Sequence, residues 1–285
     1  MSRIAYVNGR YLPHAQAKVA IEDRGFQFAD GVYEVCEVRA GHLVDERRHT
    51  ARLDRSLHEL RMARPMSLAA LSVVLHETVR RNRVHDGIVY FQVTRGVARR
   101  EFNFPHADTK PTLVVTARSN DPARLEKAAN DGIGVVTVPD IRWQRVDIKS
   151  VALLPNVLAK QAAYDQGARE AWLVDKNGKV TEGASSNAWI VSRDGKLITR
   201  QLGQDILGGI TRSVVLDLAK AQGLAFEERT FSVEEAYSAR EAFVTSASQI
   251  VQPVVSIDGK PVGNGAPGLV ASALRRDYHD HADIS

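Results

Sequence analysis

Short apolar runs joined by glycine-containing turns constrain the fold of this chain more than any other feature. The stretch "YVNGRYL" (6–12) places Asn8-Gly9 between two strand-like segments, and Asn-Gly favours a tight hairpin. The stretch "EVRAGHLV" (37–44) has a similar pattern, and Asn177-Gly178 and Asp194-Gly195 mark further turns. Because antiparallel hairpins are prominent and strand and helix do not alternate regularly, the sequence predicts an α+β fold and argues against a Rossmann fold.

Several segments carry apolar residues at helical spacing. The clearest are 48–61, 67–82 and 210–223, and the last of these ends at Gly223, a common residue at the end of a helix. A polar, turn-rich stretch near residue 120 is the best candidate for a linker. The predicted organisation is a small N-terminal α+β domain over 1–118, a linker over 119–124, and a larger C-terminal α/β domain over 125–285.

The composition is that of an ordinary globular protein. The net charge is only +4 for 38 basic and 34 acidic side chains, and no aromatic residues are interleaved with the basic clusters, so we expect no binding to nucleic acid. No stretch approaches the ~20 apolar residues that span a membrane, and no signal peptide is recognisable. Cys36 is the one cysteine, so there is no internal disulfide and a cytoplasmic location is expected.

A lysine inside an apolar stretch is the first candidate for chemistry. In "VDIKSVALLPN" (146–156), Lys149 is followed closely by Val151, Leu153 and Leu154. An ammonium group is costly to remove from water, so such surroundings favour the neutral amine. A neutral amine can attack a carbonyl or form a Schiff base. Most lysines in such places only begin a helix or extend their charge to solvent, so this pattern alone does not identify a site.

Three other stretches supply groups that complement such a lysine. "VTEGASSN" (180–187) places Glu182 before small residues that would let a flat ligand approach. "LGGITR" (207–212) places two glycines before a helix, where free backbone N–H groups can bind phosphate. Arg52, on the helix 48–61, can hold a phosphate with two hydrogen bonds. A Schiff-base lysine, a carboxylate for a ring nitrogen and phosphate contacts are what pyridoxal 5′-phosphate (PLP) requires.

In this order and spacing, the set resembles the fold-type IV PLP enzymes over nearly the whole chain. Within that family the chain looks most similar to the D-amino-acid aminotransferases, so the resemblance implies a two-domain fold of that type. The stretches that carry the resemblance are "EDRGFQFADGVYEV" (22–35), "YFQVTRG" (90–96), "DIRW" (140–143), "DIKS" (147–150), "LAKQ" (158–161), "VTEGASSN" (180–187) and "GITR" (209–212).

The resemblance also implies roles for single residues, and it implies no metal. Lys149 would form the Schiff base and move the proton at Cα, and Glu182 would pair with the pyridine nitrogen. Leu207 would pack on the ring. The phosphate contacts would come from Arg52, Ile210, Thr211, Ser246 and Ser248. Within "TSASQ" (245–249), Ala247 stands where the family has a hydroxyl, which is a departure from the family pattern.

A further set implied by the resemblance would hold the substrate carboxylate. Tyr33 is present, and Arg100 occupies the arginine position, beside Arg99. Phe102 stands where D-amino-acid aminotransferases have a histidine. Arg100 would reach into the active site of the neighbouring subunit, which implies at least a homodimer. The expected reaction is transamination of a D-amino acid such as D-alanine with 2-oxoglutarate or pyruvate, with side activity on (R)-primary amines.

Other functions stay open at this point. An aminodeoxychorismate lyase eliminates pyruvate from the same kind of adduct, and a branched-chain aminotransferase acts on L-amino acids with the same fold. The stretch "GVYEV" (31–35) and the arginine after "TRG" (94–96) favour a D-amino-acid aminotransferase over both. A non-catalytic binding protein is the most distant alternative, because Lys149, Glu182 and Arg52 are all retained.

Overall fold

The computed structural model describes residues 3–285, and the chain forms two compact units. The N-terminal unit contains the chain up to Asp121 together with Ile148–Ala152 and Asp283–Ser285, and the C-terminal unit contains Pro122–Asp147 and Leu153–Ala282. The short segment with Lys149 thus packs in the N-terminal unit, whereas the sequence-based division placed all of 125–285 in one domain. The two units are described separately below.

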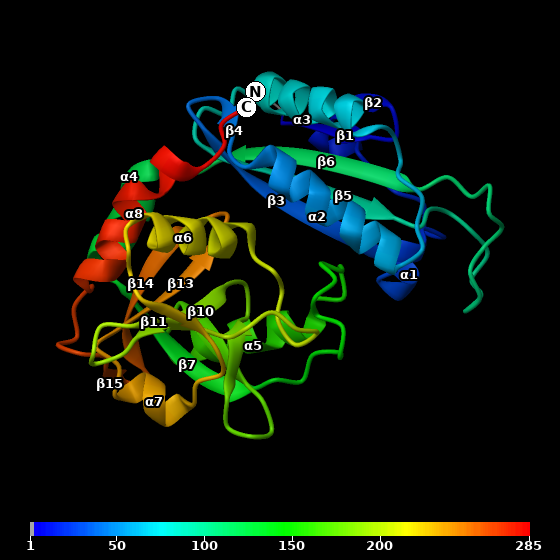
Figure 1. The fold of residues 1–285 in the computed structure, drawn as a ribbon. Coiled ribbons are helices and arrows are strands. Elements are labelled where there is room, and N and C mark those ends of the chain that lie inside the picture. The colour runs from blue at the N-terminus through cyan, green and yellow to red at the C-terminus, as the bar shows by residue number, and fades with distance from the viewer. Residues whose placement is uncertain (1–2) are drawn as a thin grey trace. The chain divides into compact units, whose positions relative to one another are not determined.

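The N-terminal unit is built on an antiparallel sheet of six strands with the order β2-β1-β6-β5-β3-β4. Figure 1 shows the helices α2 and α3 lying along this sheet. The strands are β1 (Ile4–Val7), β2 (Arg10–Pro13), β3 (Gly31–Arg39), β4 (His42–Leu43), β5 (Gly87–Thr94) and β6 (Thr112–Ser119). The helices are the short 3-10 helix η1 (His14–Gln16), α1 (Arg24–Phe28), α2 (Glu46–Glu59) and α3 (Leu68–Asn82).

Alternation along β3 decides which side chains enter the core. Val32, Glu34 and Cys36 are fully buried, whereas Tyr33 and Val35 between them are partly exposed, as expected for a strand with one covered face. The buried face packs against apolar residues of both helices, such as Leu53 of α2 and Leu75 of α3. One face of the sheet is therefore core, and Tyr33 lies on the other.

The C-terminal unit is built on a mixed sheet of nine strands. Its order is β12-β11-β10-β13-β14-β7-β8-β9, with β15 beside β14. The strands are β7 (Ile133–Pro139), β8 (Glu170–Val174), β9 (Val180–Gly183), β10 (Asn187–Val191), β11 (Leu197–Thr199), β12 (Phe226–Glu228), β13 (Glu241–Ser246), β14 (Ile250–Ile257) and β15 (Lys260–Pro261). The helices are α4 (Pro122–Asp131), α5 (Leu154–Asp165), α6 (Ile210–Ala221), α7 (Val233–Tyr237) and α8 (Leu269–His281).

Both faces of this sheet are covered at its centre. Along β7, Val135 points into a cluster with Trp172 and Phe231, whereas Val136 points into a second cluster with Ala159 of α5. Parallel pairing of β7 with β8 and with β14 fits strands that are buried on both faces. The remaining pairs are antiparallel apart from β11 with β12, and so the prediction of an α+β fold is confirmed.

Most local predictions agree with the structure. Asn8 and Gly9 form the turn between β1 and β2 with φ angles of 44° and 91°, the left-handed values that a tight hairpin turn requires. The helices predicted at 48–61, 67–82 and 210–223 correspond to α2, α3 and α6. The helix α4 was missed. It begins at Pro122, inside the stretch predicted as a linker, and buries only Ala129, which leaves little apolar pattern to detect.

Candidate active site

Lys149 is fixed at the edge of the N-terminal sheet. Its carbonyl oxygen accepts from the backbone N–H of Tyr33 at 3.0 Å, and its own N–H donates to the buried Oγ of Ser56 at 3.3 Å. Two residues on, the N–H of Val151 donates to the carbonyl of Gly31 at 3.0 Å. The segment 148–152 therefore pairs with the start of β3, which holds the backbone of Lys149 rigidly.

The amine of Lys149 lies against an aromatic pair. Its Nζ is 4.2 Å from the ring centroid of Tyr33, and this ring stacks on that of Tyr90 at 5.5 Å. Burial and the adjacent Tyr33 raise the pKa of Tyr90, so its hydroxyl stays protonated and donates to Gln92 at 2.6 Å. The apolar surroundings predicted for Lys149 are incomplete, because Lys149 is only half-buried and Leu154 is 69% exposed.

Arg52 points from α2 to a buried carboxylate on β3. Its Nε and Nη2 donate to the two oxygens of Glu34 at 2.7 and 2.8 Å, and Nδ1 of His49 is 2.8 Å from the same carboxylate. Burial alone would raise the pKa of Glu34, but the charge and hydrogen bonds of Arg52, aided by His49, lower it to about 2. Burial also lowers the pKa of His49. Glu34 is therefore ionised and fixes the orientation of Arg52.

Glu182 occupies the end of β9 in the C-terminal unit, where it is almost fully buried. One carboxylate oxygen accepts from Nη1 of Arg142, and the other accepts from Nδ2 of Asn187 at 2.9 Å and from the N–H of Leu207 at 3.1 Å. Hydrogen bonds from a cation and from two neutral donors favour the ionised carboxylate. Its side chain is therefore presented in one defined orientation.

Arg142 connects Glu182 to a second carboxylate. Its Nε and Nη2 donate to Asp140 at 2.9 and 2.7 Å, and Nη2 also approaches Oγ1 of Thr181 at 3.3 Å. Burial by itself would lower the pKa of Arg142, but Asp140 and Glu182 raise it. Arg142 is thus a largely buried cation that anchors Glu182.

The predicted phosphate-binding residues of the C-terminal unit gather close to Glu182. Nδ2 of Asn187 also donates to the carbonyl of Leu207 at 2.9 Å. Leu207 lies two residues before Gly209, which caps α6 with no side-chain hydrogen bond. The first N–H groups of a helix have no partner within the helix and attract anions. In the neighbouring strand β13, Thr245 is the register partner of Asn187, so Ser246, the last residue of β13, and the turn with Ser248 lie at the same edge.

Close packing at this edge leaves no room for a side chain at Gly209. A Cβ there would lie 2.0 Å from Oδ1 of Asn187, whereas one on Gly208 would meet nothing closer than a side-chain atom of Leu202 at 3.7 Å. A buried carboxylate, a helix N-terminus and a glycine that keeps the backbone accessible fit a flat anionic cofactor with a basic ring nitrogen.

Comparison with known proteins identifies the family. Residues 31–257 match the family described as amino-transferase class IV. A D-alanine aminotransferase of Staphylococcus haemolyticus is 39% identical over 278 residues, which cover 98% of this chain and 97% of that protein. A D-alanine aminotransferase of Bacillus licheniformis is 42% identical and covers 92% of this chain and 90% of its own length. The chain belongs to the class IV aminotransferases.

Solved structures show the fold of this class IV aminotransferase. The branched-chain amino acid aminotransferase of Escherichia coli superposes with a TM-score of 0.87, covers 98% of this chain and 94% of its own, and is 24% identical, so it bears on the fold alone. A second branched-chain amino acid aminotransferase, solved with pyridoxamine 5′-phosphate, superposes with a TM-score of 0.88 at 26% identity over the same shares of the two chains. The predicted fold type is therefore confirmed.

The substrate-binding residues predicted after β5 lie in the N-terminal unit of this class IV aminotransferase. The guanidinium carbon of Arg100 is 5.2 Å from the ring centroid of Phe28, and the ring of Phe102 packs on the same residue at 5.6 Å. Phe102 is 85% exposed. Arg99 instead approaches Glu101 at 3.5 Å and its side chain is 89% exposed. Tyr33, on β3, lies beside Lys149 as described above.

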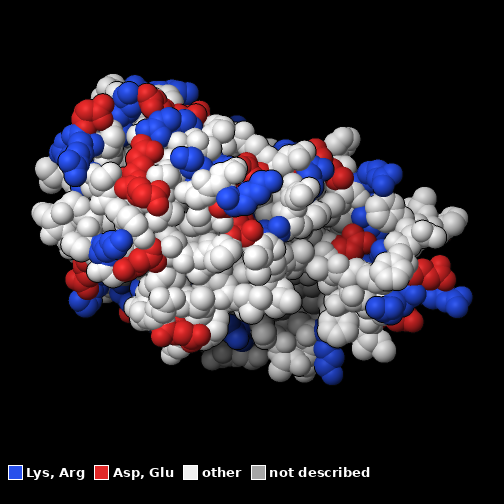
Figure 2. All heavy atoms as spheres, turned by 90° about the horizontal axis from the view of Figure 1, so that it is seen from below, with Lys and Arg blue, Asp and Glu red and all other residues white. Residues whose placement is uncertain are grey.

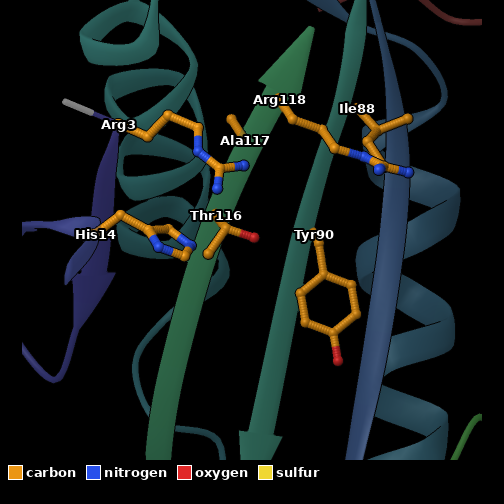
Figure 3. A pocket seen from close by; sticks show the side chains of 7 residues that line it. All are labelled: Arg3, His14, Ile88, Tyr90, Thr116, Ala117 and Arg118. Atoms are coloured by element: carbon orange, nitrogen blue, oxygen red, sulfur yellow. The ribbon is translucent and has the colours of Figure 1, made fainter. Parts of the chain in front are cut away.

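A pocket of about 230 Å³ opens on the exposed face of the N-terminal sheet. Figure 3 shows its lining side chains on β5, β6 and the segments near β1, with Tyr90 at one end. Through Tyr90 the pocket adjoins the aromatic pair that contacts Lys149. No candidate site residue predicted from the sequence lines it. The lining residues are Arg3, His14, Ile88, Tyr90, Thr116, Ala117 and Arg118.

Three further features of the described chain are its surface charge, its possible metal ligands and the hydropathy of its helices. On the face in Figure 2, basic and acidic side chains are intermixed rather than gathered by sign. Within residues 3–285, no three or more His, Cys, Asp or Glu side chains are grouped so that they could hold a metal ion. Over the same residues, no helix has the length and hydropathy of a membrane span.

Sequence reasoning missed Glu34 and His49, although both could have been found. Glu34 has the same parity along β3 as the apolar residues Val32 and Cys36, so period-two alternation places it on the buried face. A buried carboxylate requires a partner, and His49 and Arg52 lie three residues apart on a predicted helix. The anchoring of Glu182 by Arg142 gave no comparable signal, because the two residues are 40 positions apart.

Proposed function

We propose that this class IV aminotransferase transfers the amino group of a D-amino acid such as D-alanine to a 2-oxo acid, either 2-oxoglutarate or pyruvate. The observation that carries the proposal is the 39% identity to a protein named D-alanine aminotransferase over nearly the full length of both chains. The hydrogen-bonded environments of Lys149 and Glu182 support it. The cofactor is pyridoxal 5′-phosphate.

The residues divide the work of holding that cofactor. When bound, PLP supplies an aldehyde that reacts with amines and a ring that accepts the electrons left when a Cα proton is removed. Lys149 would carry it covalently, Glu182 would face the ring nitrogen, and Leu207 would pack on the ring. We assign the phosphate to Arg52, Ile210, Thr211, Ser246 and Ser248.

Two side chains move or hold protons in this proposal. The Nζ of Lys149 takes the proton from Cα of the substrate and returns it on the cofactor side, for which a rigid backbone and a mobile side-chain end are suitable. Glu182 holds a proton on the ring nitrogen, because its carboxylate is kept anionic by Arg142, Asn187 and the N–H of Leu207. A protonated ring nitrogen favours removal of the Cα proton.

The substrate carboxylate is assigned to Tyr33 and Arg100, with Phe102 as an apolar wall. We infer that Arg100 serves the active site of the second subunit in a homodimer. Exposed apolar side chains support association of two copies, because large exposed apolar patches mark interaction surfaces. On α5, Leu154 is 69% exposed, Val157 is 58% exposed and Leu158 is 54% exposed, so this helix presents neighbouring apolar side chains at the surface.

We place the protein in the cytoplasm. Cys36 is free and buried, and burial together with nearby carboxylates raises the pKa of its thiol. A protein with an unpaired, unreactive thiol has no requirement for an oxidising compartment.

The half-reaction with single substrates tests the proposal. Purified protein is loaded with PLP, and conversion of the cofactor to its amine form is followed by absorbance after addition of D-alanine, L-alanine, L-leucine or (R)-1-phenylethylamine. We expect conversion with D-alanine and none with L-alanine. Conversion with L-leucine alone would instead indicate a branched-chain aminotransferase, and pyruvate release from aminodeoxychorismate without an amino acceptor would indicate a lyase.

A further inference from the structure

On both sides of Arg100, the segment that follows β5 is hydrogen-bonded to α1 or to the residues just before it. The N–H of Ala98 donates to the carbonyl of Glu22 at 3.3 Å. Nη1 of Arg24 donates to the carbonyl of Glu101 at 2.7 Å. Because both anchors lie within two residues of Arg100, the backbone that carries this arginine has little freedom relative to α1.

The arginines near this segment differ in their partners. Arg24 and Arg95 share the carboxylate of Asp30, at 2.8 and 2.7 Å, and together they lower its pKa against the opposing effect of burial. Arg99 pairs with Glu101 at 3.5 Å. Across residues 3–285, Arg100 has no carboxylate at ion-pair distance, and its guanidinium contacts the ring of Phe28 instead. Its charge is therefore available to an anionic ligand.

Phe28 is the point at which these contacts meet. Its ring receives the guanidinium groups of Arg24 at 4.7 Å and Arg100 at 5.2 Å, and the ring of Phe102 packs on it at 5.6 Å with an interplanar angle of 52°. A planar guanidinium is attracted to an aromatic face without losing its N–H donors to another acceptor. Phe28 is only half-buried, and it belongs to α1 rather than to the segment of Arg100.

We propose that Phe28 is a positioning residue that orients Arg100 toward the carboxylate of the substrate. This inference rests on the proposed aminotransferase function. It also distinguishes the two adjacent arginines, because Arg99 is already paired with Glu101. The ring of Phe102 packs on Phe28 from the exposed side and adds to this support.

Replacing Phe28 separates positioning from folding. We expect Phe28→Leu to raise KM for both D-alanine and pyruvate by about three- to tenfold, because both carry the carboxylate that Arg100 orients. The value of kcat should stay within about twofold, since the reacting groups are untouched. Phe28→Tyr keeps an aromatic face and should restore both KM values. If the leucine variant does not fold, Phe28→Met is used in its place, because methionine is unbranched and flexible enough to fill the space of the ring.

Phe104→Leu is the matched control. Phe104 lies in the segment after β5 that also carries Arg100. Its ring contacts the guanidinium groups of Arg95 at 3.9 Å and Arg61 at 4.8 Å, not that of Arg100. The same loss of an aromatic ring should there leave both KM values within about twofold. Equal effects of Phe28→Leu and Phe104→Leu would show a general loosening of the segment and would overturn the inference.

A double-mutant cycle gives the decisive readout. If Phe28 acts through Arg100, then Phe28→Leu should cause no further rise in KM in an Arg100→Leu background. Additive effects in the two backgrounds, or a fall in kcat without a change in KM, would contradict the inference while leaving the aminotransferase function intact. Absence of any half-reaction of the parent enzyme with D-alanine would instead contradict the proposed function, and the inference with it.

Discussion

Arg52 and Glu34 form a buried two-pronged ion pair, with Nε and Nη2 of the arginine at 2.7 and 2.8 Å from the two carboxylate oxygens. The pair joins α2 to β3, and Glu34 is fully buried. An arginine proposed to bind phosphate is thus oriented by a carboxylate whose own position is set by the alternation of β3. Loss of Glu34 should therefore affect both the stability of the protein and its affinity for the cofactor.

We expect Glu34→Gln to lower the free energy of unfolding at pH 7 by about 3–5 kcal/mol, because it leaves the charge of Arg52 buried without its partner. The pKa of Glu34 falls from 4.5 to about 2 on folding, so its contribution is present above pH 4.5 and is lost as the pH falls toward 2. Urea unfolding at pH 7, 4 and 3 should show the difference between parent and variant shrinking.

Glu37→Gln provides the control for this experiment. Glu37 is on the opposite face of β3 and is only half-buried, so its replacement should cost less than about 1 kcal/mol. A pH-independent difference for Glu34→Gln, or equal effects at the two positions, would show that the ion pair does not contribute in this way.

Arg142 is predicted to control the position of Glu182. Arg142→Met removes the cation that holds one oxygen of Glu182, and a displaced carboxylate should lower kcat by roughly 10- to 100-fold, since a misplacement of about 1 Å has that effect. PLP retention on dialysis should fall in parallel. Arg145→Met removes a more exposed arginine that pairs with Asp147 and should leave both properties unchanged. If kcat and cofactor retention are unchanged in Arg142→Met, Arg142 does not control the position of Glu182.

The adjacent glycines before α6 should respond differently to alanine. In Gly209→Ala the new Cβ would lie 2.0 Å from Oδ1 of Asn187, and displacing this residue disturbs hydrogen bonds to Glu182 and Leu207. We expect a loss of about 1–3 kcal/mol in stability, typical of overpacking, and weaker PLP binding. Gly208→Ala has room at 3.7 Å and should behave like the parent in thermal unfolding and cofactor titration. A larger effect of Gly208→Ala than of Gly209→Ala would mean that Gly209 does not pack against Asn187 as described.

Phe102→His should strengthen binding of substrates that carry a carboxylate. A histidine can donate a hydrogen bond that phenylalanine cannot, and a charge-assisted bond at this exposed position should lower KM for D-alanine by up to about tenfold. The KM for (R)-1-phenylethylamine, which lacks a carboxylate, is the internal comparison. Equal changes for both substrates would show that residue 102 does not act on the carboxylate.

The sequence predicted most of what depends on local pattern. The turn at Asn8-Gly9 and the helix that ends near Gly223 both follow from turn chemistry and apolar spacing. The helix α4 was missed because it begins inside the stretch predicted as a linker and buries a single alanine. Pairing of the Lys149 segment with β3 could not be predicted, because it joins residues more than a hundred positions apart.

The candidate site was predicted as separate residues but not as a network. Glu182 and Leu207 were each assigned a contact with the cofactor, and the structure adds that the N–H of one donates to the carboxylate of the other. Asn187 and Arg142 complete the surroundings of Glu182 and were not predicted as its partners, although Asn187 lies only five residues from it, whereas Arg142 lies 40 residues away. Long-range hydrogen bonds of this kind are set by tertiary packing rather than by propensity or spacing.

Covalent attachment of the cofactor can be measured directly at one atom. The protein is loaded with PLP, reduced with borohydride so that the link to the amine becomes permanent, digested, and mapped by peptide mass spectrometry. We predict a phosphopyridoxyl adduct on Nζ of Lys149, and no adduct on that peptide in Lys149→Ala. An adduct on a different lysine of the parent protein, or no adduct at all with excess cofactor, would contradict the assignment of Lys149 as the residue that carries PLP.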